Sequence, residues 1–429
     1  MRKRFFGKIL ILALIATSGC SNDPTSSEPD PPDSPDPPSG EIPSVVDPDI
    51  TIDMRSEKIS QLVGDYDNER DEPTQNQTFS RYQLRATDLG APFQDGDITW
   101  IPFGDTWGAA GGELDALAYT TDSNPEDGLD LDFIDDENGI YRPIAIQSIS
   151  QGAFEVPMEG LMVDDEMYIY HTTDHNPPVT MGRSVVATTD NPDDAQFTYL
   201  YDFSSRNFIN VSIVQVESSD WELLPEEENG KGLVILGSGS YRESDVYLAY
   251  QPQAEIRNRK SIQYFAGVDE NDEPLWSSGE DDSVPLFEHP CVGELSVSYN
   301  EFIDRWILLY NCSNPRGITM RTAENPWGPW TKSQVIFDPW QDGGYCNYIH
   351  VSWVDQNCDS VHDPGRQNEY GGEYGPYQFE HFATGDDQST TIYFTMSIWN
   401  PYTVVLMKAG LKKEITTSNE NLSYEQQNY

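Results

Sequence analysis

Three acidic residues have the types and neighbours that the cleavage of a glycosidic bond would require. Asp88 and Glu294 each open a short apolar segment, and Asp105 follows Gly104, where the backbone can turn sharply. Glycosidic cleavage needs one protonated carboxyl group that donates to the leaving oxygen and one ionised carboxylate that attacks the sugar or activates water. Asp88, Asp105 and Glu294 are therefore the candidate catalytic residues. In a chain so rich in aspartate, a solvated surface carboxylate is the alternative role for each of them.

Aromatic and polar side chains near the expected strand ends are candidates for substrate binding. Aromatic residues make up 12% of the chain, and a ring at a strand end can stack on the apolar face of a sugar. The rings in such positions are Trp107, Trp340, Tyr345, Trp353 and Trp399. Most other rings, such as Trp306 and Tyr168, suit the interior of a sheet. The predicted substrate-binding residues are Trp107, Asn210, His350 and Trp353.

Neither a metal nor a cofactor is expected. The spacing of His171 and His175 could serve a metal, but no third ligand accompanies them. The acidic stretch 127–138 lacks the regular ligand spacing of a calcium loop, so a solvated loop is the better interpretation. The chain also contains no nucleophile elbow, phosphate loop or dinucleotide fingerprint.

A repeat along the chain gives these residues their positions. Five segments resemble one another as strands, four of them ending in a turn at a proline: 119–125, 187–192, 247–252, 321–326 and 404–409. A second series precedes them, at 88–91, 159–162, 210–213, 294–297 and 350–353. An apolar and aromatic strand lies between the two series, at 98–103, 167–170, 232–236, 306–310 and 392–395. A fourth strand follows at 197–201, 261–266 and 334–337.

Such segments, rich in Tyr, Trp, Ile and Val and bounded by Asn, Gly and Pro, are typical of antiparallel strands. No amphipathic helix of convincing length is visible. Five four-stranded units of about 70 residues predict an all-β fold, a five-bladed β-propeller, whose radial repetition leaves only short edges. A pair of β-sandwiches is the alternative.

The innermost strand of each propeller blade lines the central channel, where ligands bind at one mouth. The polar residues at the start of the second series should then converge there. They are Asp88, Glu159, Asn210, Glu294 and His350. For Asn210 and Glu159 the alternative role is to satisfy backbone donors between blades.

Antiparallel pairing of neighbouring strands would bring Asp88 and Asp105 to the same rim of the first blade. We expect Asp88 to act as base or nucleophile and Asp105 as acid, although the two roles could be exchanged. Glu294, across the channel, would raise the pKa of a neighbour or bind a sugar hydroxyl.

The charge of the chain limits its partners. Lys and Arg number 25 against 73 Asp and Glu, for a net charge of −48. This excess of negative charge excludes nucleic acid and disfavours polyanionic glycans, so a neutral polysaccharide is the expected substrate. Such acidity also suggests a salty habitat. We expect the protein to be a monomer.

The first 48 residues predict export and a lipid anchor. Arg2, Lys3, Arg4 and Lys8 precede the apolar run 9–16, which is too short to span a bilayer, and small residues then lead to Cys20. This pattern resembles the bacterial lipobox, in which the cysteine is lipidated; secretion with a chance cysteine is the alternative. Nine of residues 24–48 are proline, which predicts an extended tether. The expected location is the outer membrane, facing the periplasm or the cell surface.

The expected organisation is a signal peptide at 1–19, a lipidated cysteine and tether at 20–48, a propeller at 49–413 and a polar tail at 414–429. Four further cysteines, at 291, 312, 346 and 358, fit no zinc pattern. Their even number in an oxidising compartment predicts disulfides. Three connectivities are possible, and proximity favours Cys346 with Cys358.

Several segments carry a resemblance to a known family. They are residues 87–90, 103–107, 293–300, 305–311, 321–323 and 326–330. Together they resemble the domain of unknown function 4185 family, over roughly residues 81–411. That family is grouped as glycoside hydrolase family 183, which contains endo-D-arabinanases acting on the D-arabinan of mycobacterial arabinogalactan and lipoarabinomannan. The resemblance implies a five-bladed propeller and a furanoside-cleaving hydrolase whose acids include Asp88 and Asp105.

Three functions from different classes stay open. The first is an endo-acting furanosidase on D-arabinan or a related neutral polysaccharide, with inserts at 127–141 and 358–379 able to reshape its cleft. The second is a polysaccharide lyase on uronic acids, which the negative charge of the chain disfavours. The third is a surface glycan-binding lipoprotein without catalysis, which would not require several converging carboxylates.

Overall fold

The computed structural model describes residues 40–225, 230–312 and 314–414. The predicted signal peptide, the lipidation at Cys20, the tether before residue 40 and the tail after residue 414 lie outside these residues. Within the described residues, no helix has the length and the apolar character needed to cross a membrane.

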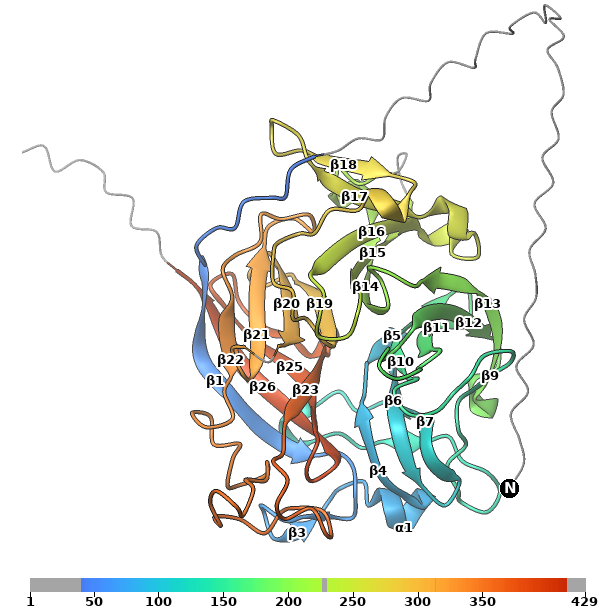
Figure 1. Ribbon diagram of the computed structural model, residues 1–429, viewed down its shortest axis with the longest axis vertical. Coiled ribbons are helices and arrows are strands. Elements are labelled where there is room, and N and C mark those ends of the chain that lie inside the picture. Colours follow the sequence, from blue (N-terminus) through green and yellow to red (C-terminus); the bar gives the residue numbers. More distant parts are fainter. Residues whose placement is uncertain (1–39, 226–229, 313, 415–429) are drawn as a thin grey trace, which may run out of the picture. The chain divides into compact units, whose positions relative to one another are not determined.

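Five sheets of mainly antiparallel strands form the five blades of a β-propeller (Figure 1). The first blade consists of β4 (Leu84–Leu89), β6 (Ile98–Gly108), β7 (Gly111–Thr120) and β8 (Asp132–Phe133), with β5 (Phe93–Asp95) also paired to β6. The second consists of β10 (Pro157–Val163), β11 (Glu166–Thr173), β12 (Arg183–Thr189), β13 (Gln196–Ser204) and β9 (Ala145–Ile146). The third consists of β14 (Asn210–Glu217), β15 (Lys231–Ser238), β16 (Val246–Pro252), β17 (Gln263–Val268) and β18 (Pro274–Ser277).

The last two blades differ in how they are completed. The fourth consists of β19 (Leu295–Asn300), β20 (Arg305–Asn311), β21 (Ile318–Ala323) and β22 (Gln334–Phe337). The fifth consists of β23 (Glu373–Gln378), β25 (Ser389–Ile398), β26 (Thr403–Lys413) and, outermost, β1 (Ile50–Gln61), with β24 (Thr384–Gly385) paired to β25. The first long strand of the chain therefore closes the ring by pairing with the last, Ile50 opposite Lys413.

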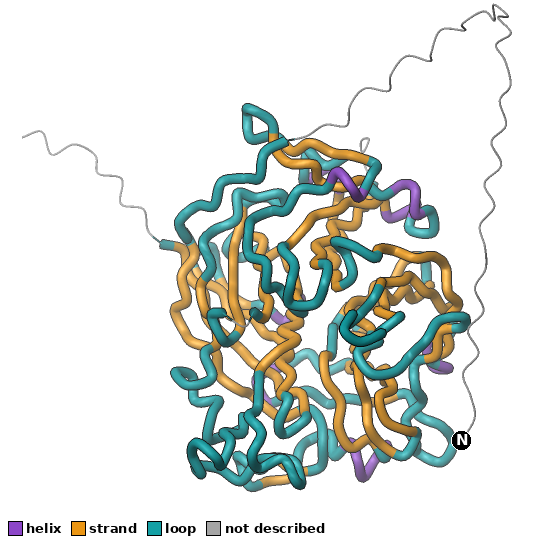
Figure 2. The backbone as a smooth tube through the Cα atoms, in the orientation of Figure 1, coloured by secondary structure: helices purple, strands orange, loops and turns teal. Residues whose placement is uncertain are grey.

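Helix is almost absent from the described residues. The single α-helix there is α1 (Thr78–Tyr82). Short 3-10 turns lie at 125–127, 192–194, 218–220, 253–255, 259–261, 280–282 and 380–382, and a small hairpin joins β2 (Tyr66–Asp67) to β3 (Glu72–Pro73). Loops make up the rest, and a large group of them lies at the lower left of Figure 2.

The core of the propeller lies between neighbouring blades. The second strand of a blade is covered on both faces, so β15 and β20 are buried along almost their whole length. Strands covered on both faces need apolar side chains at consecutive positions, which explains why these segments read as unbroken apolar runs. The aromatic rings of Trp306, Trp330 and Phe208 are fully buried between the sheets.

The predicted propeller is confirmed, and its predicted second, third and fourth strands each overlap an observed strand. The inner strand of the fifth blade was assigned wrongly. Residues 350–353 form no strand, and β23 takes that place. His350 is instead a buried side chain whose ring bonds Asp359 through Nδ1 at 2.5 Å and the carbonyl of Gln367 through Nε2 at 2.9 Å.

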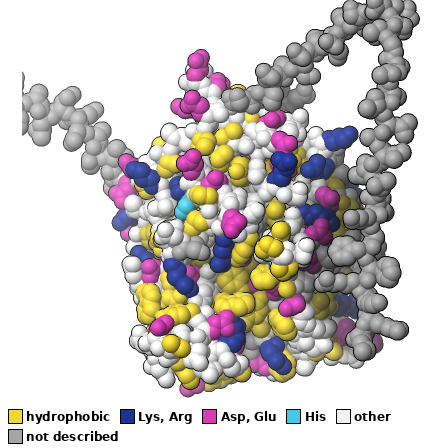
Figure 3. Space-filling view, viewed as in Figure 1, with side chains coloured by type: hydrophobic (Ala, Val, Ile, Leu, Met, Phe, Trp, Pro, Cys, Tyr) yellow, Lys and Arg dark blue, Asp and Glu magenta, His cyan; other side chains and the backbone are white. Residues whose placement is uncertain are grey.

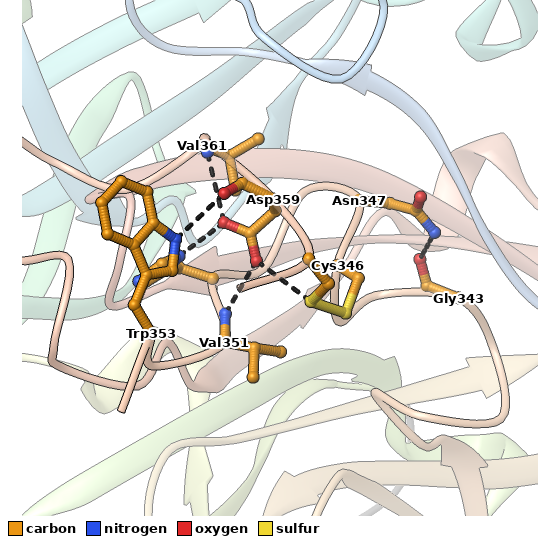
Figure 4. The surroundings of a disulfide bond; sticks show 9 residues. Gly343, Cys346, Asn347, Val351, Trp353, Asp359 and Val361 are labelled. Carbon is orange, nitrogen blue, oxygen red and sulfur yellow. Dashed lines mark hydrogen bonds and ion pairs between the residues drawn. A yellow bond between two sulfur atoms is a disulfide. The ribbon is translucent and has the colours of Figure 1, made fainter. Parts of the chain in front are cut away.

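Both disulfides are formed, Cys291 with Cys312 and Cys346 with Cys358. The favoured pairing is thus confirmed. The second bond lies in the long connection between β22 and β23, where Asp359 organises the nearby loop (Figure 4). Its carboxylate accepts from the backbone of Val351 at 3.0 Å, and its carbonyl accepts from Nε1 of Trp353 at 3.1 Å.

Candidate active site

A cavity of about 500 Å³ opens at the end of the channel where β19 and β23 begin and β4 ends. Glu294, immediately before β19, and Glu373, the first residue of β23, stand at this mouth. A smaller cavity of about 270 Å³ lies where those strands end, lined among others by Gln215 and Gln378. The ionisable residues that line the larger cavity include Asp88, Asp105, Tyr241, Arg242, Glu294, Arg316, Glu373 and Tyr374.

Asp88 is buried on the inner strand of the first blade, opposite Gly104 of β6. Its Oδ2 accepts a hydrogen bond of 2.8 Å from the hydroxyl of Tyr374, and Tyr402 also donates to this carboxylate. Its Oδ1 has no partner among the described residues. Burial raises the pKa of Asp88 above its usual range, the two phenols lower it, and the charge of Glu294 raises it again.

The backbone beside Asp88 and at Asp105 adopts a conformation that ordinary strands avoid. Leu89 has φ of 62° and Asp105 has φ of 35°, both in the left-handed region that residues other than glycine rarely occupy. The ladder between β6 and β7 slips between Phe103 and Thr106, which re-aims the side chain of Asp105. Gly104 is needed because a Cβ there would lie 2.9 Å from Oδ1 of Asp88.

Asp105 is half-buried at the same mouth. Both of its carboxylate oxygens accept from the backbone N–H of Phe154 at 3.2 Å. Burial is the largest cause that raises its pKa, followed by the charges of Asp88 and Asp115, while the bond from Phe154 opposes them. Two neighbouring acids with raised pKa values favour a state in which one carries a proton and the other is ionised.

A buried contact between a carboxyl group and a histidine lies behind Asp105. The carboxylate of Asp115 on β7 is 2.9 Å from Nε2 of His171 on β11, and both side chains are buried. Nδ1 of His171 bonds the carbonyl of Thr172 at 2.6 Å. Asp115 also accepts from the backbone N–H of Asp105. Nε2 of His171 thus fixes Asp115, which in turn holds the backbone of Asp105.

Across the cavity, Glu294 is held by a tyrosine and faces an arginine. The hydroxyl of Tyr241 donates to Oε1 of Glu294 at 2.8 Å, and Oε2 has no partner among the described residues. The guanidinium of Arg242 lies 4.9 Å from the centre of the Tyr241 ring, and its Nε is also without a partner there. The free lone pair and the free N–H suit a hydroxyl group, which can both donate and accept.

Sequence reasoning missed the fourth acid of the cavity, Glu373, and its partner Arg316. Glu373 is buried, its Oε1 accepts from the backbone of Gly317 at 3.0 Å, and the same oxygen lies 3.4 Å from Nε of Arg316. Burial raises the pKa of Glu373, while the Arg316 charge lowers it. A glycine pair precedes Glu373 and a Gly-Pro pair follows Tyr374. Such residues argue against a strand, so no signal in the sequence identified the pair.

The predicted catalytic residues come together, and the predicted substrate-binding residues do not. Asp88, Asp105 and Glu294 line one cavity, whereas Trp107, Asn210, His350 and Trp353 are absent from its lining. Trp107 and Trp353 are exposed by 46% and 37%, which leaves both accessible at the surface. The roles of all seven residues remain predictions.

Two residues expected at the mouth are buried and do not line the larger cavity. Asn210 is buried at the start of β14, with neither polar atom of its side chain partnered within the described residues. Glu159 lines the smaller cavity and accepts from the backbone N–H groups of Ile213 and Gly160 at 3.0 Å. Burial raises the pKa of Glu159 to about 7. Glu159 thus has the alternative role of satisfying backbone donors between blades.

No preformed metal centre emerges from the described residues. Two groups contain three potential ligand atoms close together, and each includes the sulfur atoms of a disulfide. Disulfide sulfur is not the thiolate that binds metals. His175 lies apart from both groups and contacts the ring of Phe154 at 4.9 Å between centroids.

Comparisons with known proteins give one family. A family model described as a domain of unknown function, DUF4185, matches residues 73–408. No curated protein matches the chain.

Similar solved structures are distant in sequence. An α-L-arabinofuranosidase from Podospora anserina in complex with cellotriose is 10% identical, with 85% of this chain and 98% of that chain covered and a TM-score of 0.43. The GH43_1 enzyme from Xanthomonas citri complexed with xylotriose is 11% identical, with coverages of 76% and 87% and a TM-score of 0.41. An endo-arabinase from Bacteroides thetaiotaomicron is 13% identical, with coverages of 77% and 95% and a TM-score of 0.37.

Proposed function

Because the chain belongs to the DUF4185 family, we propose that it is a glycoside hydrolase, an endo-acting furanosidase that cleaves D-arabinan or a related neutral polysaccharide. One observation carries the proposal. Asp88 and Asp105 stand on neighbouring strands at the mouth of one cavity, and burial raises the pKa of each. A pair of carboxyl groups that shares one proton near neutral pH has the composition that glycosidic cleavage requires.

The environments of the two acids favour different roles. Two phenols donate to Asp88, which stabilises its ionised form and leaves Oδ1 to attack the anomeric carbon or to take a proton from water. Asp105 receives one backbone N–H and lies beside the charges of Asp88 and Asp115, so it keeps its proton to higher pH. Asp105 would then donate that proton to the leaving oxygen.

The charges of the cavity support a neutral substrate. Four carboxyl groups, those of Asp88, Asp105, Glu294 and Glu373, share the cavity with the two guanidinium groups of Arg242 and Arg316. Arg316 already lies 3.4 Å from Glu373. A uronic acid polymer would bring further negative charge against this excess, whereas the hydroxyl groups of a pentose can use both the oxygens and the N–H groups.

A polysaccharide lyase is the second candidate, because Tyr241 stands beside Arg242 in the cavity. Lyase chemistry would use a phenolate as base. The phenols of Tyr241 and Tyr374 donate to carboxylates, and burial raises both of their pKa values well above 10. Neither is therefore a good base near neutral pH, which disfavours the lyase.

The decisive experiment is product analysis after incubation with a panel of arabinans, galactans and uronic acid polymers. Internal hydrolysis of D-arabinan, without the ultraviolet absorbance of an unsaturated product, is the expected result. Asp88→Asn and Asp105→Asn should each lower turnover by several orders of magnitude and leave the melting temperature nearly unchanged. If either variant keeps more than about a tenth of the wild-type activity, a loss below ~1.4 kcal/mol, the residue is not the catalyst.

We also propose that the domain is held at the outer membrane through a lipid on Cys20. The signal-like segment, the small residues before Cys20 and the proline-rich tether support this location.

A further inference from the structure

An exposed tryptophan stands near the cavity without any role in the proposed chemistry. Trp340 follows β22 in the long connection to β23, and its side chain is 55% exposed. In the face shown in Figure 3, hydrophobic side chains gather at the lower left, where Figure 1 draws this connection. A large aromatic ring exposed to water can stack on the apolar face of a sugar.

A path of rings joins Trp340 to the cavity. The centroids of Trp340 and Tyr345 are 4.7 Å apart, and those of Tyr345 and Tyr370 are 5.8 Å apart. Tyr370 lines the cavity, as does Arg316, whose guanidinium lies 5.3 Å from the centre of the Tyr345 ring. The hydroxyl of Tyr345 also donates to Gly371, another lining residue, at 3.4 Å. The path therefore ends at the site of the proposed chemistry.

The turn that carries Trp340 is fixed before any ligand arrives. The carboxylate of Asp338 accepts from the backbone N–H groups of Trp340 and Gln341 at 2.9 and 2.8 Å. Asp342 forms a salt bridge with Arg55 of β1, with one contact of 2.9 Å. A segment that is already ordered loses little conformational entropy on binding, so more of the contact energy contributes to affinity.

We propose that Trp340 and Tyr370, which pack against the buried ring of Tyr345, bind the sugar chain beyond the cleaved bond, as an aromatic path that selects polymer over short fragments. The inference rests on the proposed function, since the occupant is the same neutral polysaccharide. Trp340 offers the exposed ring on which an apolar sugar face stacks, and Tyr370 leads the chain into the cavity. Asp342 and Glu373 beside the path are paired with Arg55 and Arg316, and Asp338 adds a further carboxylate, so the path offers a polyanionic glycan no excess of positive charge.

The test measures binding and cleavage separately. Binding is measured by affinity electrophoresis of proteins that carry Asp88→Asn, in gels containing the polysaccharide of the panel that retains this variant most strongly. Adding Trp340→Ala should weaken retention about tenfold, equivalent to about 1.4 kcal/mol, whereas Trp340→Phe should retain most of it. Leu223→Ala is the surface control, because Leu223 is 42% exposed, follows β14 and does not line the larger cavity.

Cleavage by the otherwise unaltered enzyme gives the second readout. Trp340→Ala should raise KM for polymer about tenfold and leave kcat/KM for a trisaccharide unchanged. Equal retention and equal KM in Trp340→Ala and wild type overturn the aromatic path while leaving the hydrolase intact. Loss of retention in a protein that cleaves nothing overturns the hydrolase and keeps the path. Retention of no neutral polysaccharide overturns the path.

Discussion

The hydrogen bond from Tyr374 to Asp88 should set the acidic limb of the pH profile. Tyr374→Phe removes the hydroxyl that donates to Oδ2 at 2.8 Å and keeps the ring. A hydrogen bond to a charged group stabilises it by about 1.5–3 kcal/mol, and one pKa unit corresponds to about 1.4 kcal/mol. Because Tyr402 still donates to the same carboxylate, we expect the pKa of Asp88 to rise by about one unit.

The direction in which the acidic limb moves depends on the protonation state in which Asp88 acts. As base or nucleophile it must be ionised, so a higher pKa removes the active form at low pH. The acidic limb of kcat/KM should therefore move up by about one pH unit, with activity below it reduced about tenfold. Above the limb, where Asp88 is ionised in both proteins, the two profiles should coincide. The assay is release of reducing ends from the polymer across a pH series.

A matched control separates this effect from the loss of any buried hydroxyl. Tyr170 is fully buried in the second blade, and its hydroxyl has no partner among the described residues. Tyr170→Phe should leave the profile unchanged. If Tyr374→Phe also leaves the acidic limb in place, Asp88 is not the ionised catalyst and its assignment must be given up.

Three further predictions test the site, the charge and the anchor. Gly104→Ala should abolish activity in a folded protein, since its Cβ would lie 2.9 Å from Oδ1 of Asp88 and 2.7 Å from Cγ1 of Val156; crystallography and turnover of the variant check this. The melting temperature should rise on adding sodium chloride, because screening relieves the self-repulsion of a chain with net charge −48; a fall measured by scanning calorimetry would contradict it. Wild-type cells should incorporate a fatty-acid analogue at Cys20, and a Cys20→Ala variant that still takes up label would refute the anchor.

The repeat in the sequence predicted most of the propeller because its middle strands are covered on both faces. Such strands must be apolar at consecutive positions, so β15 and β20 stand out without any knowledge of their partners. The closing strand β1 was not assigned. Its pairing with β26 joins residues at opposite ends of the domain, and the sequence of 50–61 does not by itself identify that partner.

The inner strands were harder to predict because two features of the sequence indicated the wrong residues. Residues 350–353 share the pattern of 210–213, yet they form a loop around a buried histidine and aspartate. The real inner strand, β23, contains Gly375 and Pro376, which normally argue against a central strand. The acids of the first blade were predictable because they flank recognisable strands, whereas Tyr241, Arg242 and Arg316 stand in loops whose positions only the fold determines.

Ring closure by β1 and β26 determines when the propeller can be completed during synthesis. The twelve residues of β1 emerge early, and the strand that completes their ladder is among the last of the domain to be made. Until then β1 is an unpaired strand and β25 lacks its outer neighbour, so the nascent chain carries two open edges of the kind that pair with other molecules. A premature stop before β26 would therefore yield an aggregation-prone chain with unpaired strand edges in place of a slightly smaller folded propeller.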